Sequence, residues 1–283
     1  MIGVRYRRAV LAFAVGTCAN PTIADAQIGC PAADWPGPPA VESELPWTAD
    51  SREYRSWGGG FSGTPLGVGH LAVGFVEGGP DPSDWLPHVR VPLFPSPGAP
   101  APTTWIDRGW WIPIAPSAAP RPLTYRGMVE TGYEVPSFIV HATRDDGWIQ
   151  ILVDIGPLAV RGASSGLMWT HTCLLGEGAL PLTLVLWEDA FVGRPGFTWR
   201  DGVRHALRTG PGTEHDRLAW VETDDELELL EIEGEWARVR VTSPGRYETT
   251  CLGREWTGQE REGWVKWRDE ASGPWVWFPT RGC

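Results

Sequence analysis

Apolar and polar residues alternate over short stretches of this chain, most regularly between residues 226 and 241. In the segment WARVRV, which begins at Trp236, the Ala and Val side chains fall on one face of an extended strand and the Trp and Arg side chains on the other. The turn Glu233-Gly234-Glu235 joins this segment to a second alternating run, and a slip of one residue would expose the valines. Apolar residues at helical spacing do not persist for several turns without Gly or Pro. The pattern predicts an all-β protein.

The sequence contains a repeat. The segment WLPHVRVPLFPSPG, which begins at Trp85, aligns without gaps to WRDGVRHALRTGPG, which begins at Trp199, at an offset of 114 residues (199 − 85) and with Trp, Val, Arg, Leu, Pro and Gly in common. Farther along, tryptophans match in the pairs Trp148 and Trp236, and Trp169 and Trp264. We also align residues 129–131 with 221–223, which leaves insertions at about 103–126 and 241–263. A period this long indicates two domains rather than a solenoid.

The second copy carries motifs in a defined order. It opens with R-x-G-P-x-T from Arg208 to Thr213, continues with G-x-W-x-x-V around Trp236 and closes with Gly263-Trp264-Val265. This order resembles the bacterial SH3-like (SH3b) family over roughly residues 199–283. The resemblance implies two tandem SH3-like small β-barrels, and it implies recognition of cell-wall peptides, glycans or another envelope protein.

The beginning of the chain has the features of a secretory signal peptide. Arg5, Arg7 and Arg8 precede a short apolar run, and Ala24-Asp25-Ala26 offers a cleavage site. The apolar run is shorter than the roughly 20 residues of a membrane span. We therefore expect export to the periplasm or the extracellular space, with no membrane span after removal of the signal. The expected organisation is a signal peptide at 1–26, an extended Pro/Gly-rich arm at 27–68, a first barrel with its insertion at 69–190 and a second barrel at 191–283.

Four cysteines remain after signal removal, and an even count in an exported chain predicts two disulfides. Three connectivities are compatible with the count, and we favour Cys30–Cys173, which ties the arm to the first domain, and Cys251–Cys283 within the last. The chain has a net charge of −11, from 24 Lys and Arg against 35 Asp and Glu. It therefore lacks the excess of basic residues that is typical of proteins that bind nucleic acids or anionic lipids.

Catalytic and metal chemistry finds little support in the sequence. His171 and Cys173 lie two residues apart, which would suit a nucleophile and its base, but a disulfide cysteine beside a surface histidine is the favoured interpretation. His205, His215 and Asp216 match no standard metal spacing. We expect no enzyme activity, no metal and no cofactor.

The aromatic residues are the best binding candidates, because rigid rings stack on sugars, prolines and peptide backbones. We expect core or groove positions for Trp148, Trp169, Trp236 and Trp264, and a surface position for at least one of Trp110 and Trp111. The cluster Trp267, Trp275 and Trp277 is a further candidate. The expected function is an exported, non-enzymatic binding module. The alternatives are a purely structural scaffold and a cysteine-dependent hydrolase.

Overall fold

The structure is a computed structural model, and it describes residues 30–31, 35–41, 65–81, 84–115, 118–123, 125, 128–132, 135–153, 166–176, 178–193, 196–199, 203–223, 225–242, 260–270 and 273–277. The expected signal peptide and the expected Cys251–Cys283 pair lie outside these residues. We call residues 65–193 the first half and residues 196–277 the second half. In the described part of the chain, no helix has both the length and the apolar character needed to cross a membrane.

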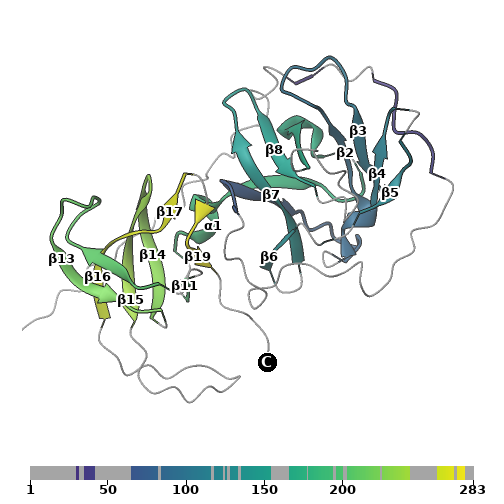
Figure 1. The fold of residues 1–283 in the computed structure, drawn as a ribbon. Coiled ribbons are helices and arrows are strands. Elements are labelled where there is room, and N and C mark those ends of the chain that lie inside the picture. The colour runs from purple at the N-terminus through teal and green to yellow at the C-terminus, as the bar shows by residue number, and fades with distance from the viewer. Residues whose placement is uncertain are drawn as a thin grey trace, which may run out of the picture.

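The first half consists of two antiparallel sheets (Figure 1). The larger has the order β10-β1-β7-β8-β9, with β6 also paired to β7, and its strands are β1 (Gly69–Val73), β6 (Val129–Gly132), β7 (Val135–Thr143), β8 (Trp148–Leu152), β9 (Leu167–His171) and β10 (Leu182–Leu186). The smaller runs β2-β3-β4-β5, with β2 (Arg90–Leu93), β3 (Thr104–Asp107), β4 (Trp110–Pro113) and β5 (Arg121–Pro122). Two 3-10 turns, Leu86–His88 and Thr172–Leu174, flank them. One apolar core, which includes Val91, Phe138, Ile149 and Ile151, holds the sheets together.

The second half is built on one five-stranded antiparallel sheet of order β13-β12-β16-β15-β14. Its strands are β12 (His205–Arg208), β13 (Arg217–Val221), β14 (Glu226–Glu233), β15 (Trp236–Thr242) and β16 (Glu260–Lys266). Two short ladders complete it: β11 (Thr198–Trp199) with β19 (Val276–Trp277), and β17 (Arg268–Asp269) with β18 (Gly273–Pro274). As the alternation predicts, Ala237, Val239 and Val241 are fully buried.

The all-β prediction is confirmed, but the prediction of closed barrels is wrong: in neither half do the described strands close. In the first half the isolated bridges Val89–Gly178 and Phe94–Trp169 are the backbone pairing that the described residues show between the two sheets. In the second half β13 and β14 lie at the two ends of the sheet. The apolar faces are instead covered by packing, sheet on sheet in the first half and by a helix and the C-terminal strands in the second.

The two halves nevertheless share a strand-pairing register. The ladder β8–β9 pairs Trp148 with His171, and β15–β16 pairs Trp236 with Lys266, two residues beyond the matched Trp169 and Trp264. Trp169 and Trp264 also have corresponding partners on the neighbouring strand. Phe94 bridges Trp169 and Arg208 pairs with Trp264, and these two partners differ by the repeat offset of 114 residues. Both copies also have an irregularity at the same place, between Val140 and Ala142 in β7 and between Leu229 and Glu231 in β14. The same three-stranded meander is therefore built twice, as β7-β8-β9 (the first meander) and as β14-β15-β16 (the second meander).

One part of the sequence alignment is wrong. Residues 221–223 do not correspond to 129–131, because β6 pairs with β7 whereas β13 pairs with β12. The hairpin β2–β3 pairs Leu93 with Thr104, and β12–β13 pairs Leu207 with Ala219 in the same register. Strand β3, which we had assigned to an insertion, thus occupies the place of β13.

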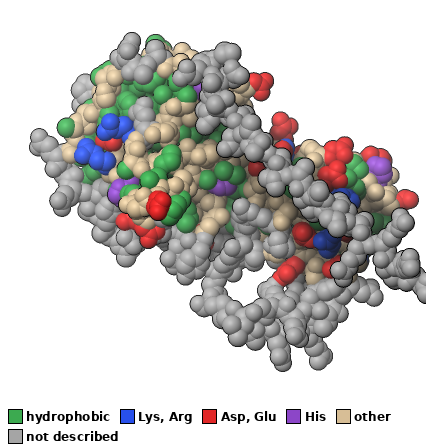
Figure 2. Space-filling model, turned by 180° about the vertical axis from the view of Figure 1, so that it is seen from behind, with side chains coloured by type: hydrophobic (Ala, Val, Ile, Leu, Met, Phe, Trp, Pro, Cys, Tyr) green, Lys and Arg blue, Asp and Glu red, His purple; other side chains and the backbone are tan. Residues whose placement is uncertain are grey.

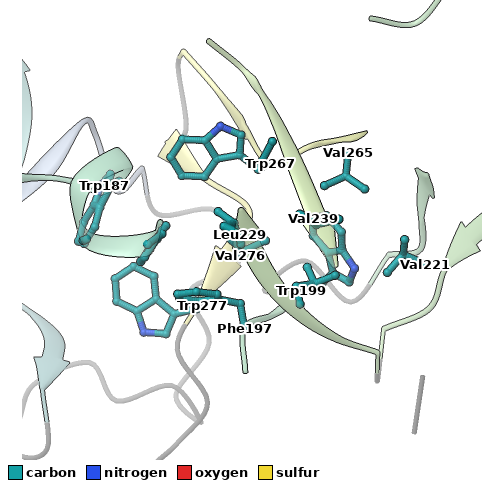
Figure 3. Close-up of a cluster of buried hydrophobic side chains, with 14 of the residues drawn as sticks. Trp187, Phe197, Trp199, Val221, Leu229, Val239, Val265, Trp267, Val276 and Trp277 are labelled. Atoms are coloured by element: carbon teal, nitrogen blue, oxygen red, sulfur yellow. The ribbon is translucent and has the colours of Figure 1, made fainter. Parts of the chain in front are cut away.

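A shared aromatic core joins the halves (Figure 3). The helix α1 (Trp187–Phe191) follows β10, and the Trp187 ring lies edge-on to Trp277, with 5.1 Å between centroids. The Trp187 Nε1–H donates to the Leu66 carbonyl at 2.9 Å, and Phe191 packs edge-on to Trp267. Trp267 and Trp277 are therefore core residues and not the surface recognition residues considered above, whereas Trp275 is half-buried.

The first prediction concerns this junction. Trp277→Ala removes a buried ring that contacts both Trp187 and Phe191, so we expect the free energy of unfolding to fall by about 3–5 kcal/mol. Urea denaturation followed by circular dichroism measures it. The control is Phe75→Ala, at a side chain 80% exposed, which should change stability by less than about 0.5 kcal/mol. Equal effects of the two substitutions would show that the rings do not hold the junction.

The second prediction concerns pH. His141 is the unpaired residue of the β7 irregularity, its Nε2 is buried without a hydrogen-bond partner among the described residues, and burial lowers its pKa. The folded state then binds a proton more weakly than the unfolded chain, so stability is lost as the pH falls below about 6.5. His141→Leu, which copies Leu230 at the matching position, should reduce the difference in unfolding free energy between pH 8 and pH 5. An unchanged difference would assign the pH dependence to other groups.

Candidate functional site

An aromatic face lies on the outer side of the first meander. We call it the first face; it comprises Phe94, Trp148, Trp169, His171 and Leu174. Because successive side chains of a strand point to opposite sides, Trp148 faces away from Ile149, which is in the core. The Phe94 and Trp148 rings meet edge to face at 5.0 Å, and Trp148 meets His171 in the same way at 5.5 Å.

The N-terminal arm covers this face. The ring of Trp35 lies edge-on to Phe94 at 5.2 Å, and its Nε1–H donates to the Pro100 carbonyl at 2.9 Å. Five residues earlier, Cys30 is bonded to Cys173, with a Cα–Cα distance of 6.1 Å, which confirms the predicted pairing. Trp148 is only 4% exposed, and Trp35 packs against the cluster to which it belongs. The part of the first face around Phe94 is therefore already occupied by a segment of its own chain, whereas Trp169 is half-buried.

His171 supports the disulfide. Its ring accepts a hydrogen bond from the Cys173 backbone N–H at Nδ1 (3.2 Å), so Nε2 carries the proton and donates to the Asp146 carbonyl at 2.7 Å. Gly147, at φ +87°, leaves room for the ring, since a Cβ there would lie 2.6 Å from it. The expectation of a surface histidine is wrong, because His171 is 1% exposed.

The same arrangement bears on catalysis and on metal binding. Donor atoms of Cys30, His171 and Cys173 all lie within 4.8 Å of one another. The two sulfurs are bonded to each other, so neither is a thiolate ligand or a nucleophile in this state. The His171–Cys173 spacing is thus explained by the anchoring of the arm.

The second face is the matching outer side of the second meander. It carries Trp236 and Trp264, both half-buried, with Arg208 in the place of Phe94 and Lys266 in the place of His171. Their neighbours across the sheet are charged, whereas Val265 on the opposite side is fully buried. The second face is therefore aromatic and charged, where the first is aromatic and apolar.

Ion pairs order the charged part of the second face. Arg240 lies between Glu262, at 3.0 Å, and Glu228, and the hydrogen bond to Glu262 and the charge of Glu228 raise the pKa of Arg240. Arg238 pairs with Glu231 at 3.2 Å. These pairs are exposed, so each contributes little to stability. They leave a row of alternating charges beside the tryptophans.

The remaining tryptophan candidates lie elsewhere. Trp110 and Trp111 are adjacent in β4, both are half-buried, and Trp111 packs against the core of the first half. They are not part of either face. Phe94 and Trp35 were not predicted as site residues. Phe94 could have been found from the repeat, because it lies 114 residues before Arg208. Nothing in the sequence marked Trp35 beyond its place in a Pro-rich arm.

Comparison with protein families, with curated proteins and with solved structures finds no match for this chain. The SH3-like resemblance consequently rests on the sequence motifs alone.

The third prediction concerns the arm. Cys30→Ser removes the disulfide that attaches the arm to the first half. We therefore expect the free energy of unfolding to fall by about 2–4 kcal/mol and Trp35 to dissociate from the first face. Hydroxyl-radical footprinting with mass spectrometry should then show a several-fold rise in modification of Trp148, with Trp236 as the internal reference. Trp35→Ala, which keeps the disulfide, should also raise modification of Trp148 with a smaller loss of stability. Unchanged modification of Trp148 in both variants would contradict coverage by the arm.

Proposed function

We propose that the chain is an exported, non-enzymatic binding protein with two tandem SH3-like modules. The second face, with Trp236 and Trp264, recognises a cell-wall peptide or glycan, or a protein of the cell envelope. The first face is closed by the arm and serves as a structural anchor.

The observation that carries this proposal is the contrast between two matching faces. Both occupy the same side of the same meander, in the same register. The first holds Trp35 from the arm and is sealed by Cys30–Cys173. The contrast lies at one pair of matching positions: Trp148 is 4% exposed, whereas Trp236 is half-buried, as are Trp169 and Trp264. A matching position whose aromatic ring is more exposed in one copy favours a recognition role for that copy.

The composition of the second face favours a ligand with both apolar and polar parts. Indole rings supply flat apolar area for a sugar ring or a peptide backbone at a low entropic cost. Arg208, Arg238 and Lys266 lie on the same side of the sheet, where Arg238 and Lys266 pair with Glu231 and Glu235, so this side offers charges of both signs to the polar groups of a ligand. Muropeptides and envelope proteins offer both kinds of group.

A purely structural role is the second candidate. It is favoured by the number of aromatic rings in the junction core, where Trp187, Trp267 and Trp277 are almost fully buried. A scaffold would use its tryptophans in this way and would bind no wall component.

The fourth prediction separates these two roles. In a pull-down with purified peptidoglycan, Trp236→Ala and Trp264→Ala should each reduce retention about tenfold, because each removes a stacking surface of a binding hot spot. Trp110→Ala is the matched control for loss of a half-buried tryptophan outside the second face, and thermal unfolding checks that all three variants fold.

Two results would go against the proposal. Equal retention of the wild type and both second-face variants would leave those rings without a recognition role. A complete lack of retention of the wild type, combined with a failure to capture any envelope protein, would favour the scaffold.

A further inference from the structure

A pocket on the first half lies apart from both aromatic faces. Its volume is about 600 Å³, and it is lined by Pro87, His88, Val89, Arg90, Asp107, Arg108, Gly178 and Ala179. On the side of the molecule seen in Figure 2, acidic side chains occur over both halves and basic ones gather in a few small groups. Two arginines, Arg90 and Arg108, line this pocket although the chain has a net charge of −11.

A buried carboxylate orients these two arginines. Asp107 is 3% exposed, and its two oxygens accept hydrogen bonds from Nε of Arg90 at 2.9 Å and from Nε of Arg108 at 3.3 Å. The arginine side chains are 43% and 64% exposed. Because both bonds use Nε, the Nη groups are not needed to hold Asp107. One carboxylate also neutralises only one of two guanidinium charges, so the group is cationic.

The backbone fixes the position of Arg108. Asp107 pairs with Trp110, so Arg108 and Gly109 form a two-residue hairpin turn, with φ of +49° and +79°. A turn with positive φ at both central residues favours Asn, Asp or Gly at the first, and an arginine there is strained. The Arg108 N–H donates to the Val89 carbonyl at 3.2 Å, which ties the turn to the pocket wall. Strain of this kind accompanies functional positions.

The second copy lacks this arrangement. Arg204 stands 114 residues after Arg90, but its guanidinium lies over the Trp220 ring at 4.5 Å. The counterpart of Asp107, the last residue of β3, is Glu222, which directly follows β13. Unlike Asp107, Glu222 is exposed. The pocket is therefore a property of the first half alone and not of the shared meander.

We propose that this pocket binds an organic carboxylate, such as the C-terminus of a short peptide. Guanidinium groups bind carboxylates through paired, charge-assisted hydrogen bonds, and the exposed edges of Arg90 and Arg108 are the donors. Pro87 and Ala179 supply apolar wall for the body of the ligand. A volume of about 600 Å³ exceeds what an inorganic anion fills, and it falls within the range of small-molecule sites.

The fifth prediction tests the pocket by calorimetric titration of the full chain with N-acetyl-alanyl-alanine. The C-terminal amide of the same peptide is the neutral control, and sodium sulfate is the inorganic one. The free acid should bind saturably, and the amide at least about tenfold more weakly, because a charged hydrogen-bonded pair is lost. Arg90→Gln and Arg108→Asn should weaken binding of the free acid by about the same factor. Asn suits the positive φ at position 108, so this variant preserves the turn.

Control variants make the result decisive. Arg144→Gln removes an exposed arginine of the first half that pairs with Asp146, outside the pocket, and should leave affinity unchanged. Arg90→Lys keeps the charge but loses the planar fork, so it should bind more weakly than the wild type. Equal binding of acid and amide, no binding of the acid, or stronger binding of sulfate than of the acid would each overturn the proposal. Because the pocket does not include Trp236 or Trp264, failure here leaves the peptidoglycan test unaffected.

Discussion

The packing of aromatic rings between the two halves determines the arrangement of this chain. Open sheets expose apolar faces, and here those of the second sheet are covered by α1 and by the strands around Trp267 and Trp277. The N-terminal side contributes too, since the Trp187 indole donates to Leu66, 121 residues away in sequence. Arg268 and Glu188 add an ion pair at 2.8 Å across the same junction. The core of the second half therefore includes residues of the first half, whereas the sheets of the first half also enclose a separate core of their own.

On this common framework, two copies of one meander have diverged on their outer sides. The inner positions stay apolar in both, with Ile149 and Ile151 in one and Ala237 and Val239 in the other. The outer positions differ: Phe94 and His171 are replaced by Arg208 and Lys266. The inner side is constrained by burial, whereas the outer side keeps its two tryptophans and changes at the positions around them. In the first copy the arm packs against the changed outer residue Phe94, and in the second copy we propose that the ligand binds at the outer side.

The sequence predicted the parts of this structure that depend on local pattern. Alternation identified β14, β15 and the buried valines, and the even cysteine count led to Cys30–Cys173. It could not predict features that depend on distant partners. Burial of Trp277 requires Trp187, and burial of His171 requires the glycine at 147 and the Asp146 carbonyl. The prediction of closed barrels was wrong for the same reason. The apolar face of the second sheet is covered by a helix and by C-terminal strands, which are distant partners. The assignment of residues 103–126 to an insertion failed because pairing partners are not visible in an alignment.

The long separation between Cys30 and Cys173 has a consequence for biosynthesis. The chain is made from its N-terminus, so Cys30 emerges 143 residues before the cysteine to which it bonds. During this interval its thiol is unpaired, and any earlier cysteine contact would be incorrect. Docking of Trp35 must wait until β8, β9 and the turn after them have formed, because they supply the surface on which it lies. The arm is therefore synthesised before the strands on which it lies but docks after them.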